Sequence, residues 1–210
     1  TALYFHILNH DPKKPNDPKR DRLFLSHGHV APVWYATLAH AGYLPRKELL
    51  TLRKLGSRLQ GHPERKSLPP IENPAGPLGQ GLSQAVGYAY IAKQEKANFR
   101  VFCLTSDGEI NEGQAWEAFM FAAKNKLHNL TLMLDRNYIQ IDGNTEDIMP
   151  LEPLRAKFEA FNFHVLEIDG HNMQAIIDAC NEAKTIEDRP TMILARTIPG
   201  KGVSYMEGKS

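Results

Sequence analysis

The chain reads Ser106-Asp107-Gly108-Glu109 directly after a short apolar run at 101–105, and Asp135-Arg136-Asn137 directly after a second apolar run. A segment with helical periodicity, 114–126, separates the two runs. The order strand, acidic glycine turn, helix, strand, polar turn predicts two consecutive parallel strands that carry these polar turns at their carboxyl ends. Open α/β sheets bind their ligands at that edge, so this unit predicts both the fold class and the position of a site.

Short apolar runs alternate with helix-period segments along much of the remaining chain. The alternation predicts an α/β fold with a mostly parallel sheet and helices on both faces. We expect helices around Trp34, after Pro45, after a cap at Ser83, along a stripe that includes Trp116 and Met120, and in two later segments. The expected strands are 23–26, 101–105, 130–134, 164–168 and 191–197, and the two later helices are 153–161 and one that carries Ile176 and Cys180.

Length and composition narrow the class of protein. The chain has 210 residues, of which 42% are hydrophobic, and a net charge of +1, which favours one globular domain and gives no support for nucleic-acid or membrane-surface binding. Cys103 and Cys180 lie in apolar runs without a C-x-x-C motif, so they predict buried thiols in a reducing compartment, the cytoplasm. Thr1 is not a natural start, and we expect the N-terminus to be truncated.

Asp107 and Asn137 are the candidate metal ligands. Two oxygen-bearing side chains at one sheet edge suit a hard cation such as Mg²⁺, which takes its other ligands from phosphate and water. The alternative is that Asp107-Gly108 serves only the conformation of a turn. One strand-helix-strand unit separates the two residues, and this spacing favours the metal.

A long irregular stretch, 60–81, is rich in proline and glycine. A loop of this length inside a compact domain is more often functional than not. His62 lies in it between Gly61 and Pro63 and is a candidate functional histidine, whereas His29 is on its own equally well a solvent-facing strand residue. Glu112 and its neighbour Glu117 are equally well explained as carboxylates at a helix N-terminus.

The motifs around both polar turns resemble the thiamine-diphosphate motif of transketolases. Further stretches agree in order, and the resemblance covers nearly the whole chain; it is strongest to the separate N-terminal subunit of split transketolases. The stretches that carry it are Leu25-Ser26-His27-Gly28-His29, Gly61-His62-Pro63-Glu64, Gly76-Pro77-Leu78-Gly79-Gln80-Gly81, Thr105-Ser106-Asp107-Gly108-Glu109, Asp135-Arg136-Asn137-Tyr138-Ile139-Gln140-Ile141-Asp142-Gly143 and the tail Gly200-Lys201-Gly202.

The resemblance implies a diphosphate-binding (PP-type) domain over 1–210 that ends before the family's C-terminal histidine. It implies thiamine diphosphate and Mg²⁺, or Ca²⁺ or Mn²⁺, as cofactors. The implied metal ligands are Asp107, Asn137 and the main-chain carbonyl of Ile139. The implied cofactor-binding residues are His29, Gly76, Pro77, Leu78, Ser106, Asp107, Gly108, Glu109, Asn137 and Ile141.

The resemblance assigns catalytic roles to His29, His62 and Glu112, with Glu112 at a subunit contact. The family usually has Gly where this chain has Ser106, but a serine with negative φ keeps the backbone N–H that a diphosphate needs. The activity implied is transfer of a two-carbon ketol unit from a ketose phosphate to an aldose phosphate, as in the pentose phosphate pathway.

Two parts of the family's active site are not found in these 210 residues: the domain whose carboxylate activates the aminopyrimidine, and an arginine-rich sugar-phosphate site. The expected partner is therefore a C-terminal subunit with a pyrimidine-binding domain, in a heterotetramer in which this chain also self-associates. The alternatives are a subunit like deoxyxylulose-phosphate synthase or the E1 part of a 2-oxo acid dehydrogenase, and a non-catalytic cofactor-binding module.

Overall fold

The computed structural model describes residues 1–141 and 143–209. Its centre is a five-stranded sheet with the order β1-β2-β3-β7-β6, in which every neighbouring pair is parallel. The α/β class expected from the alternation of apolar runs is confirmed. The strands are β1 Arg22–Leu25, β2 Val101–Ser106, β3 Leu130–Arg136, β6 His164–Asp169 and β7 Thr191–Arg196.

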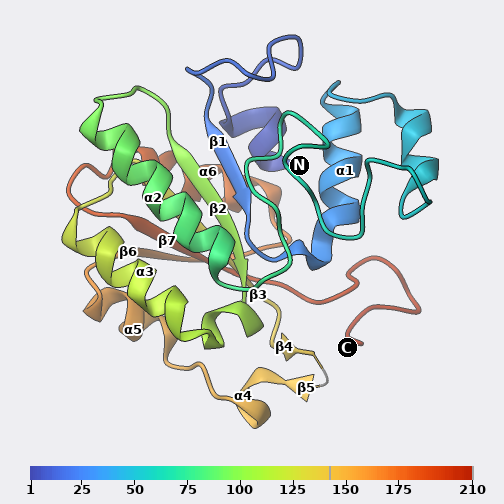
Figure 1. The fold of residues 1–210 in the computed structure, drawn as a ribbon. Helices are drawn as coiled ribbons and strands as arrows, with labels where there is room; N and C mark the ends of the chain where they lie inside the picture. The colour runs from blue at the N-terminus through green and yellow to red at the C-terminus, as the bar shows by residue number, and fades with distance from the viewer. Residues whose placement is uncertain (142, 210) are drawn as a thin grey trace.

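Helices cover both faces of the sheet, as Figure 1 shows. One face carries α2 (Gln80–Gln94), α3 (Gly113–Lys124) and α5 (Leu154–Ala160), and the other carries α1 (Ala31–His40) and α6 (Met173–Thr185). Shorter elements connect them: a π-helical turn Leu3–Ile7, 3-10 turns Gly28–Val30, Arg46–Thr51 and Gly108–Asn111, and α4 Thr145–Ile148. A small antiparallel hairpin, β4 Ile139–Gln140 with β5 Gly143–Asn144, follows β3.

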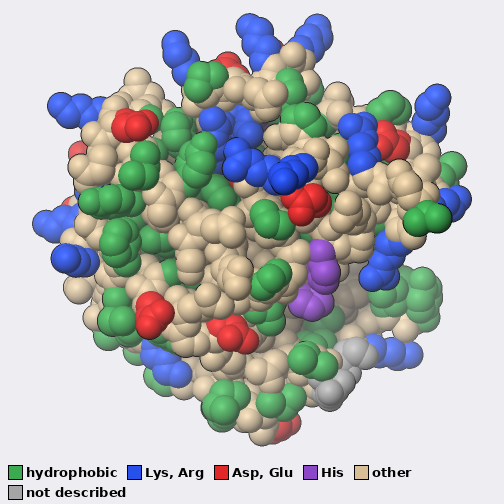
Figure 2. All heavy atoms as spheres, viewed as in Figure 1, with side chains coloured by type: hydrophobic (Ala, Val, Ile, Leu, Met, Phe, Trp, Pro, Cys, Tyr) green, Lys and Arg blue, Asp and Glu red, His purple; other side chains and the backbone are tan. Residues whose placement is uncertain are grey.

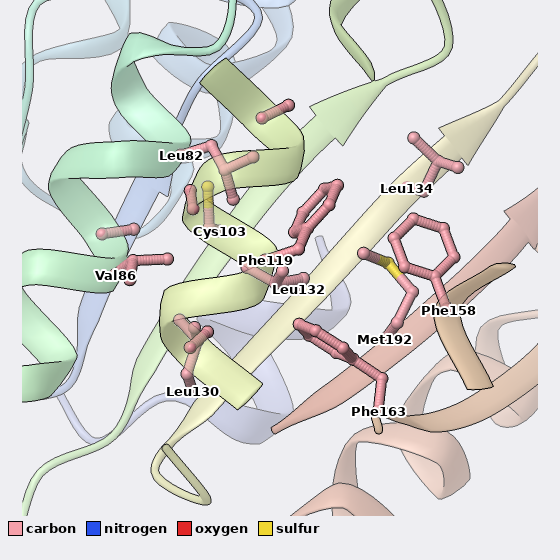
Figure 3. Packing of buried hydrophobic residues seen from close by; sticks show 14 of the residues in the cluster. Leu82, Val86, Cys103, Phe119, Leu130, Leu132, Leu134, Phe158, Phe163 and Met192 are labelled. Atoms are coloured by element: carbon pink, nitrogen blue, oxygen red, sulfur yellow. The ribbon is translucent and has the colours of Figure 1, made fainter. Parts of the chain in front are cut away.

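Each face of the sheet has its own hydrophobic core. Below α2, α3 and α5, fully buried aromatic rings from Phe119 and Phe158 meet strand residues such as Leu132 (Figure 3). The rings of Phe119 and Phe158 lie 5.1 Å apart in an edge-to-face arrangement, the geometry that aromatic quadrupoles favour. The opposite core joins Trp34 and Tyr35 of α1 to Cys180 of α6. Burial on both faces fixes the sheet and so holds the loops at its carboxyl edge.

Three local expectations are wrong. Ser83 does not cap α2, because the helix begins a turn earlier after Gly79, and the Ser83 hydroxyl donates back to the Gly79 carbonyl. The helix expected after Pro45 is instead a 3-10 turn, Arg46–Thr51, without buried residues, and Leu55 beyond it is exposed. Met120 is also exposed, since the buried stripe of α3 runs through Ala115, Phe119 and neighbours one turn away.

Candidate functional site

The carboxyl ends of β1, β2 and β3 bring three parts of the chain together. The register pairs Leu25 with Leu104 and Ser106 with Asp135, so the turns after these strands end at the same sheet edge. The first turn of α2, with the loop before it, reaches the same edge, because Gly79 and Leu82 hydrogen bond to side chains there. The candidate site is therefore assembled from segments around residues 28, 78, 107 and 137.

Asp107 is fully buried, and its two carboxylate oxygens differ. Oδ2 accepts hydrogen bonds from Arg136 Nη1 at 2.9 Å and from the Tyr138 backbone N–H at 2.6 Å. Oδ1 is buried without a hydrogen-bond partner. Burial raises the pKa of Asp107 to about 6, although the hydrogen bond and charge of Arg136 act to lower it. A buried oxygen left without a donor is a position where a cation fits.

Arg136 forms hydrogen bonds with other residues besides Asp107. Its buried guanidinium also donates to Thr145 Oγ1 at 2.9 Å, to Glu146 at 2.7 Å and to Glu152 at 3.0 Å, and it lies 3.9 Å from the centroid of the Tyr138 ring. One side chain thus joins the end of β3 to α4 and to the residues before α5. The cluster fixes Asp107 Oδ2 and leaves Oδ1 as the atom available to a ligand.

Asn137 is held from both sides. Its Nδ2 donates to Asp135 Oδ2 at 2.9 Å, and its Oδ1 accepts from the Ile139 backbone N–H at 2.9 Å. The first bond places the amide oxygen opposite Asp135, and that oxygen keeps a second lone pair. The set of Asp107 carboxylate, Asn137 amide oxygen and Ile139 carbonyl consists of hard oxygen donors, which fits Mg²⁺ rather than a soft metal.

The backbone of the turn after β2 approaches the hairpin closely at Gly108. Ser106 is the last residue of β2 and has no positive φ, so the N–H group expected there is kept. A Cβ on Gly108 would lie 3.2 Å from Cγ of Gln140, which is tighter than ordinary packing. Gly108 therefore lets the turn approach the hairpin closely, and the residues present fit a metal-bound diphosphate.

The loop before α2 is tied to this edge by buried hydrogen bonds. Glu109 Oε1 accepts from the Gly79 N–H at 2.7 Å and from the Ser26 hydroxyl, while Ser26 Oγ accepts from the Leu82 N–H at 2.7 Å. Gln114 Nε2 donates to the Leu78 carbonyl at 2.8 Å. Glu109 is itself fully buried, so it contacts the loop and not the open side. Gly76 and Leu78 are partly exposed and Pro77 is exposed.

His29 and His62 come together from segments far apart in the chain. Their rings lie 5.8 Å apart, edge to face, and both residues are exposed. Gly28 permits this approach, because a Cβ there would lie 2.5 Å from His62 Nδ1 and 3.0 Å from the Ala75 carbonyl carbon. Figure 2 shows histidine side chains gathered in one place on this face, beside a hollow. His27, by contrast, is buried, and burial lowers its pKa.

The remaining predicted residues lie at the rim. Glu112 and Glu117 are exposed at the start of α3, where a second chain could reach them. Ile141 is 82% exposed and has a φ of 46°, which is strained for a β-branched residue. Such strain occurs preferentially where a side chain is presented to a ligand.

Four residues at this edge received no role from the sequence: Ser26, Gln114, Asp135 and Arg136. Arg136 gave a usable signal, because an arginine at the end of an apolar strand requires carboxylate partners when it is buried. Ser26 and Gln114 gave none, since their partners are distant in the chain.

Three features meet at the carboxyl edge of this parallel sheet: a buried aspartate with one unpaired oxygen, an asparagine oriented by two hydrogen bonds, and a glycine that lets the backbone approach closely. Together they are typical of an α/β domain that binds a metal-diphosphate cofactor. The family described as "Transketolase, thiamine diphosphate binding domain" matches residues 1–210. The chain belongs to that family and is the thiamine-diphosphate-binding N-terminal domain of a transketolase, a transferase.

Individual relatives agree with this assignment. The chain is 46% identical over 208 residues to the 6-deoxy-6-sulfo-D-fructose transketolase subunit SqwG of Clostridium sp. (strain MSTE9), covering 99% of this chain and 76% of that protein. It is 43% identical to one subunit of the apulose-4-phosphate transketolase of Phocaeicola vulgatus, covering 99% and 74%. Its structure matches that of transketolase from Campylobacter jejuni with a TM-score of 0.93 and 37% identity, over 99% of this chain and 33% of that one.

These matches confirm the transketolase resemblance, including its split-subunit form. Within the residues that the structure describes, no helix is both long and apolar enough to cross a membrane.

Proposed function

We propose that the chain is the cofactor-binding subunit of a two-subunit transketolase that moves a two-carbon ketol unit from a ketose phosphate to an aldose phosphate. The observation that carries the proposal is the pair Asp107 and Asn137 at one sheet edge: Asp107 Oδ1 has no hydrogen-bond partner, and Asn137 Oδ1 accepts one hydrogen bond, from the Ile139 N–H, and keeps a lone pair. Three relatives, of which this chain covers 74% to 76% of the length, are named as transketolase subunits, which supports a separate partner chain.

Residues 1–210 form one diphosphate-binding domain in this proposal. Asp107, Asn137 and the Ile139 carbonyl hold Mg²⁺, and Ser106 and Gly108 lie against the diphosphate. Gly76, Pro77 and Leu78 line the cofactor, and Ile141 packs under its thiazolium ring, which gives a reason for the exposure of that side chain. When bound, thiamine diphosphate supplies the electron sink for carbon–carbon bond cleavage.

His29 and His62 orient the sugar and move protons in this scheme. Each of their exposed, adjacent imidazoles has one ring nitrogen that can donate a hydrogen bond to a sugar hydroxyl group and one that can accept a hydrogen bond from it. Glu112 lies at the contact with the partner, where exposed carboxylates of this chain meet the group that activates the aminopyrimidine. The partner is a C-terminal subunit with a pyrimidine-binding domain, and two copies of each chain form the assembly.

We assign the protein to the cytoplasm, because Cys103 and Cys180 are both free and buried, as is usual in a reducing compartment. The proposal does not specify the ketose further, because one relative is named for 6-deoxy-6-sulfo-D-fructose, a sulfonated sugar, and another for apulose 4-phosphate.

Reconstitution tests the proposal. The chain is mixed with the product of a candidate partner gene, thiamine diphosphate and Mg²⁺, and two-carbon transfer is followed with paired ketose and aldose phosphates. We expect transfer only when both chains are present, and loss of transfer in Asp107→Ala. Turnover of pyruvate in place of a ketose would instead identify a synthase-like or dehydrogenase-like enzyme.

Calorimetry separates catalysis from a binding module. Mg²⁺-dependent uptake of thiamine diphosphate without turnover of any ketose would support the non-catalytic alternative. A failure to take up the cofactor in the presence of the partner would contradict the proposal as a whole.

A further inference from the structure

Glu109 follows the metal ligand Asp107 by two residues, yet its side chain is directed away from the open side of the site. The carboxyl group is fully buried, and Oε1 receives the Gly79 N–H and the Ser26 hydroxyl. The sequence motif assigned it to the cofactor, but its observed contacts are with the loop that precedes α2.

The group joins three separate segments. Ser26 follows β1, Glu109 lies in the turn after β2, and Gly79 and Leu82 belong to the start of α2. Ser26 Oγ donates to Glu109 and accepts from the Leu82 N–H at 2.7 Å. We call Ser26, Glu109 and these two backbone N–H groups the Glu109 cross-link. It is the connection between the turn that carries Asp107 and the loop that carries Gly76, Pro77 and Leu78.

The loop could not keep this position by backbone preference alone. Gly79 has a φ of 80°, a left-handed conformation, and no side chain caps α2 there. Its N–H points inward and would be buried without an acceptor if the carboxylate were absent. Gln114 adds one bond to the Leu78 carbonyl, and Asn73 ties the earlier part of the loop to the Leu25 carbonyl, but the Gly79 and Leu82 N–H groups are held by Glu109 and Ser26.

We infer that Glu109 is a positioning residue, which sets the distance between the loop at 76–78 and the diphosphate turn at 106–108 without touching the cofactor. The inference rests on the proposed cofactor site, and it replaces the direct contact expected for this residue. The buried Oε2 makes no hydrogen bond, although the Ser106 backbone N–H lies near the carboxyl group. An amide in place of the carboxyl group therefore keeps the acceptor that the cross-link uses.

The matched pair Glu109→Ala and Glu109→Gln tests this. Glutamine keeps an acceptor at the place of Oε1, and alanine removes it. Amide exchange of Gly79 and Leu82, with Leu132 in the core as internal reference, is measured on the chain. The Kd of thiamine diphosphate with Mg²⁺ is measured by calorimetry on the chain together with its partner.

We expect Glu109→Ala to speed Gly79 exchange at least tenfold relative to Leu132 and to raise the cofactor Kd about tenfold or more, the scale of one lost buried hydrogen bond. Glu109→Gln stays within about threefold of the wild type in both measurements. Glu95→Ala, at an exposed carboxylate beyond the end of α2, serves as the control and changes neither.

Equal acceleration of Gly79 and Leu132 in Glu109→Ala would overturn the inference, because it would show a general loss of stability. An unchanged Gly79 rate would overturn it as well. If Glu109→Ala does not fold, Ser26→Ala removes the other half of the cross-link and is expected to speed Leu82 exchange selectively; an unchanged Leu82 rate there also contradicts it. Absence of cofactor binding by the wild type would contradict the proposed function, whereas the exchange rates test the cross-link independently.

Discussion

At the scale of single residues, the two oxygens of Asp107 have different surroundings and different roles. Arg136 and the Tyr138 N–H occupy Oδ2, and Oδ1 is left buried and unpaired. A desolvated carboxylate oxygen without a donor costs free energy. In the proposed site a bound cation would offset that cost, because it would satisfy the oxygen and compensate its charge.

Cation binding should therefore depend on pH near neutrality. The pKa of Asp107 is raised to about 6, and only the ionised carboxylate ligates a metal. As the pH falls below about 6, protons compete, and the apparent affinity for Mg²⁺ with thiamine diphosphate should fall roughly tenfold for each pH unit. Titration calorimetry between about pH 5 and pH 8 measures this. An affinity independent of pH over that range would show that Asp107 is not a ligand.

Arg136→Met tests the other half of the ion pair. It leaves a buried carboxylate without its cation and cuts the attachments to Thr145, Glu146 and Glu152, so we expect about 3–5 kcal/mol lower free energy of unfolding in urea. The control is Arg155→Met, which breaks an exposed pair with Glu159 and should change stability by less than about 1 kcal/mol. Equal effects of the two substitutions would contradict the role given to Arg136.

At the scale of elements, the start of α2 shows where sequence reasoning succeeds and where it fails. The helix itself and its buried face were predicted from periodicity. Its first residue was not, because Ser83 has the chemistry of a cap, whereas the real start at Gly79 is held by a glutamate thirty residues later in the chain. Local preference is a weak signal when a tertiary hydrogen bond opposes it.

Substitution by alanine should change the free energy of unfolding in opposite directions at two glycines in this region. Gly79 has a φ of 80°, and a Cβ there would lie 2.8 Å from Gln114 Cγ, so Gly79→Ala should lower the free energy of unfolding by about 1–2 kcal/mol. Gly87 is an exposed interior residue of α2 with open space around it. Gly87→Ala should raise the free energy by about 0.5–1 kcal/mol. Urea unfolding of both variants measures the difference, and the same sign for both would contradict the structure.

At the scale of the whole molecule, the sheet and its two cores are what the alternating pattern predicts well, since four of the five strands are apolar runs buried almost throughout and the fifth, β6, is a half-exposed edge strand. The place of the Asp107 turn at the carboxyl edge was predicted because its residues lie close in sequence to strand ends. The meeting of His29 with His62, and of Glu109 with Ser26, joins distant segments. No local rule in the sequence pairs them; the family resemblance placed both histidines in the site but gave no contact between Glu109 and Ser26.

The hydrophobic core formed by α3 and α5 contains the buried ring of Phe158. Phe158 is fully buried between Phe119 and the Trp116 ring, whose centroids lie 5.1 Å and 5.7 Å away. We expect Phe158→Ala to lower the free energy of unfolding by about 3–5 kcal/mol. Phe121→Ala, at a half-exposed ring beside Tyr90, should lower it by less than about 1.5 kcal/mol. Thermal unfolding of both variants measures these changes in free energy. A smaller loss for Phe158→Ala than for Phe121→Ala would show that Phe158 is not part of the core.

The chain contains two tryptophans, and the sheet separates them. Trp116 donates its indole N–H to the Ile110 carbonyl at 2.9 Å, in the turn that follows Asp107 and Glu109, whereas Trp34 donates to Tyr4 Oη at 3.0 Å on the opposite face. The protein thus has a built-in optical reporter for each side. Fluorescence of a Trp34→Phe variant would follow the face of the sheet that carries the turn after β2, and that of a Trp116→Phe variant would follow the N-terminal face, without any attached label.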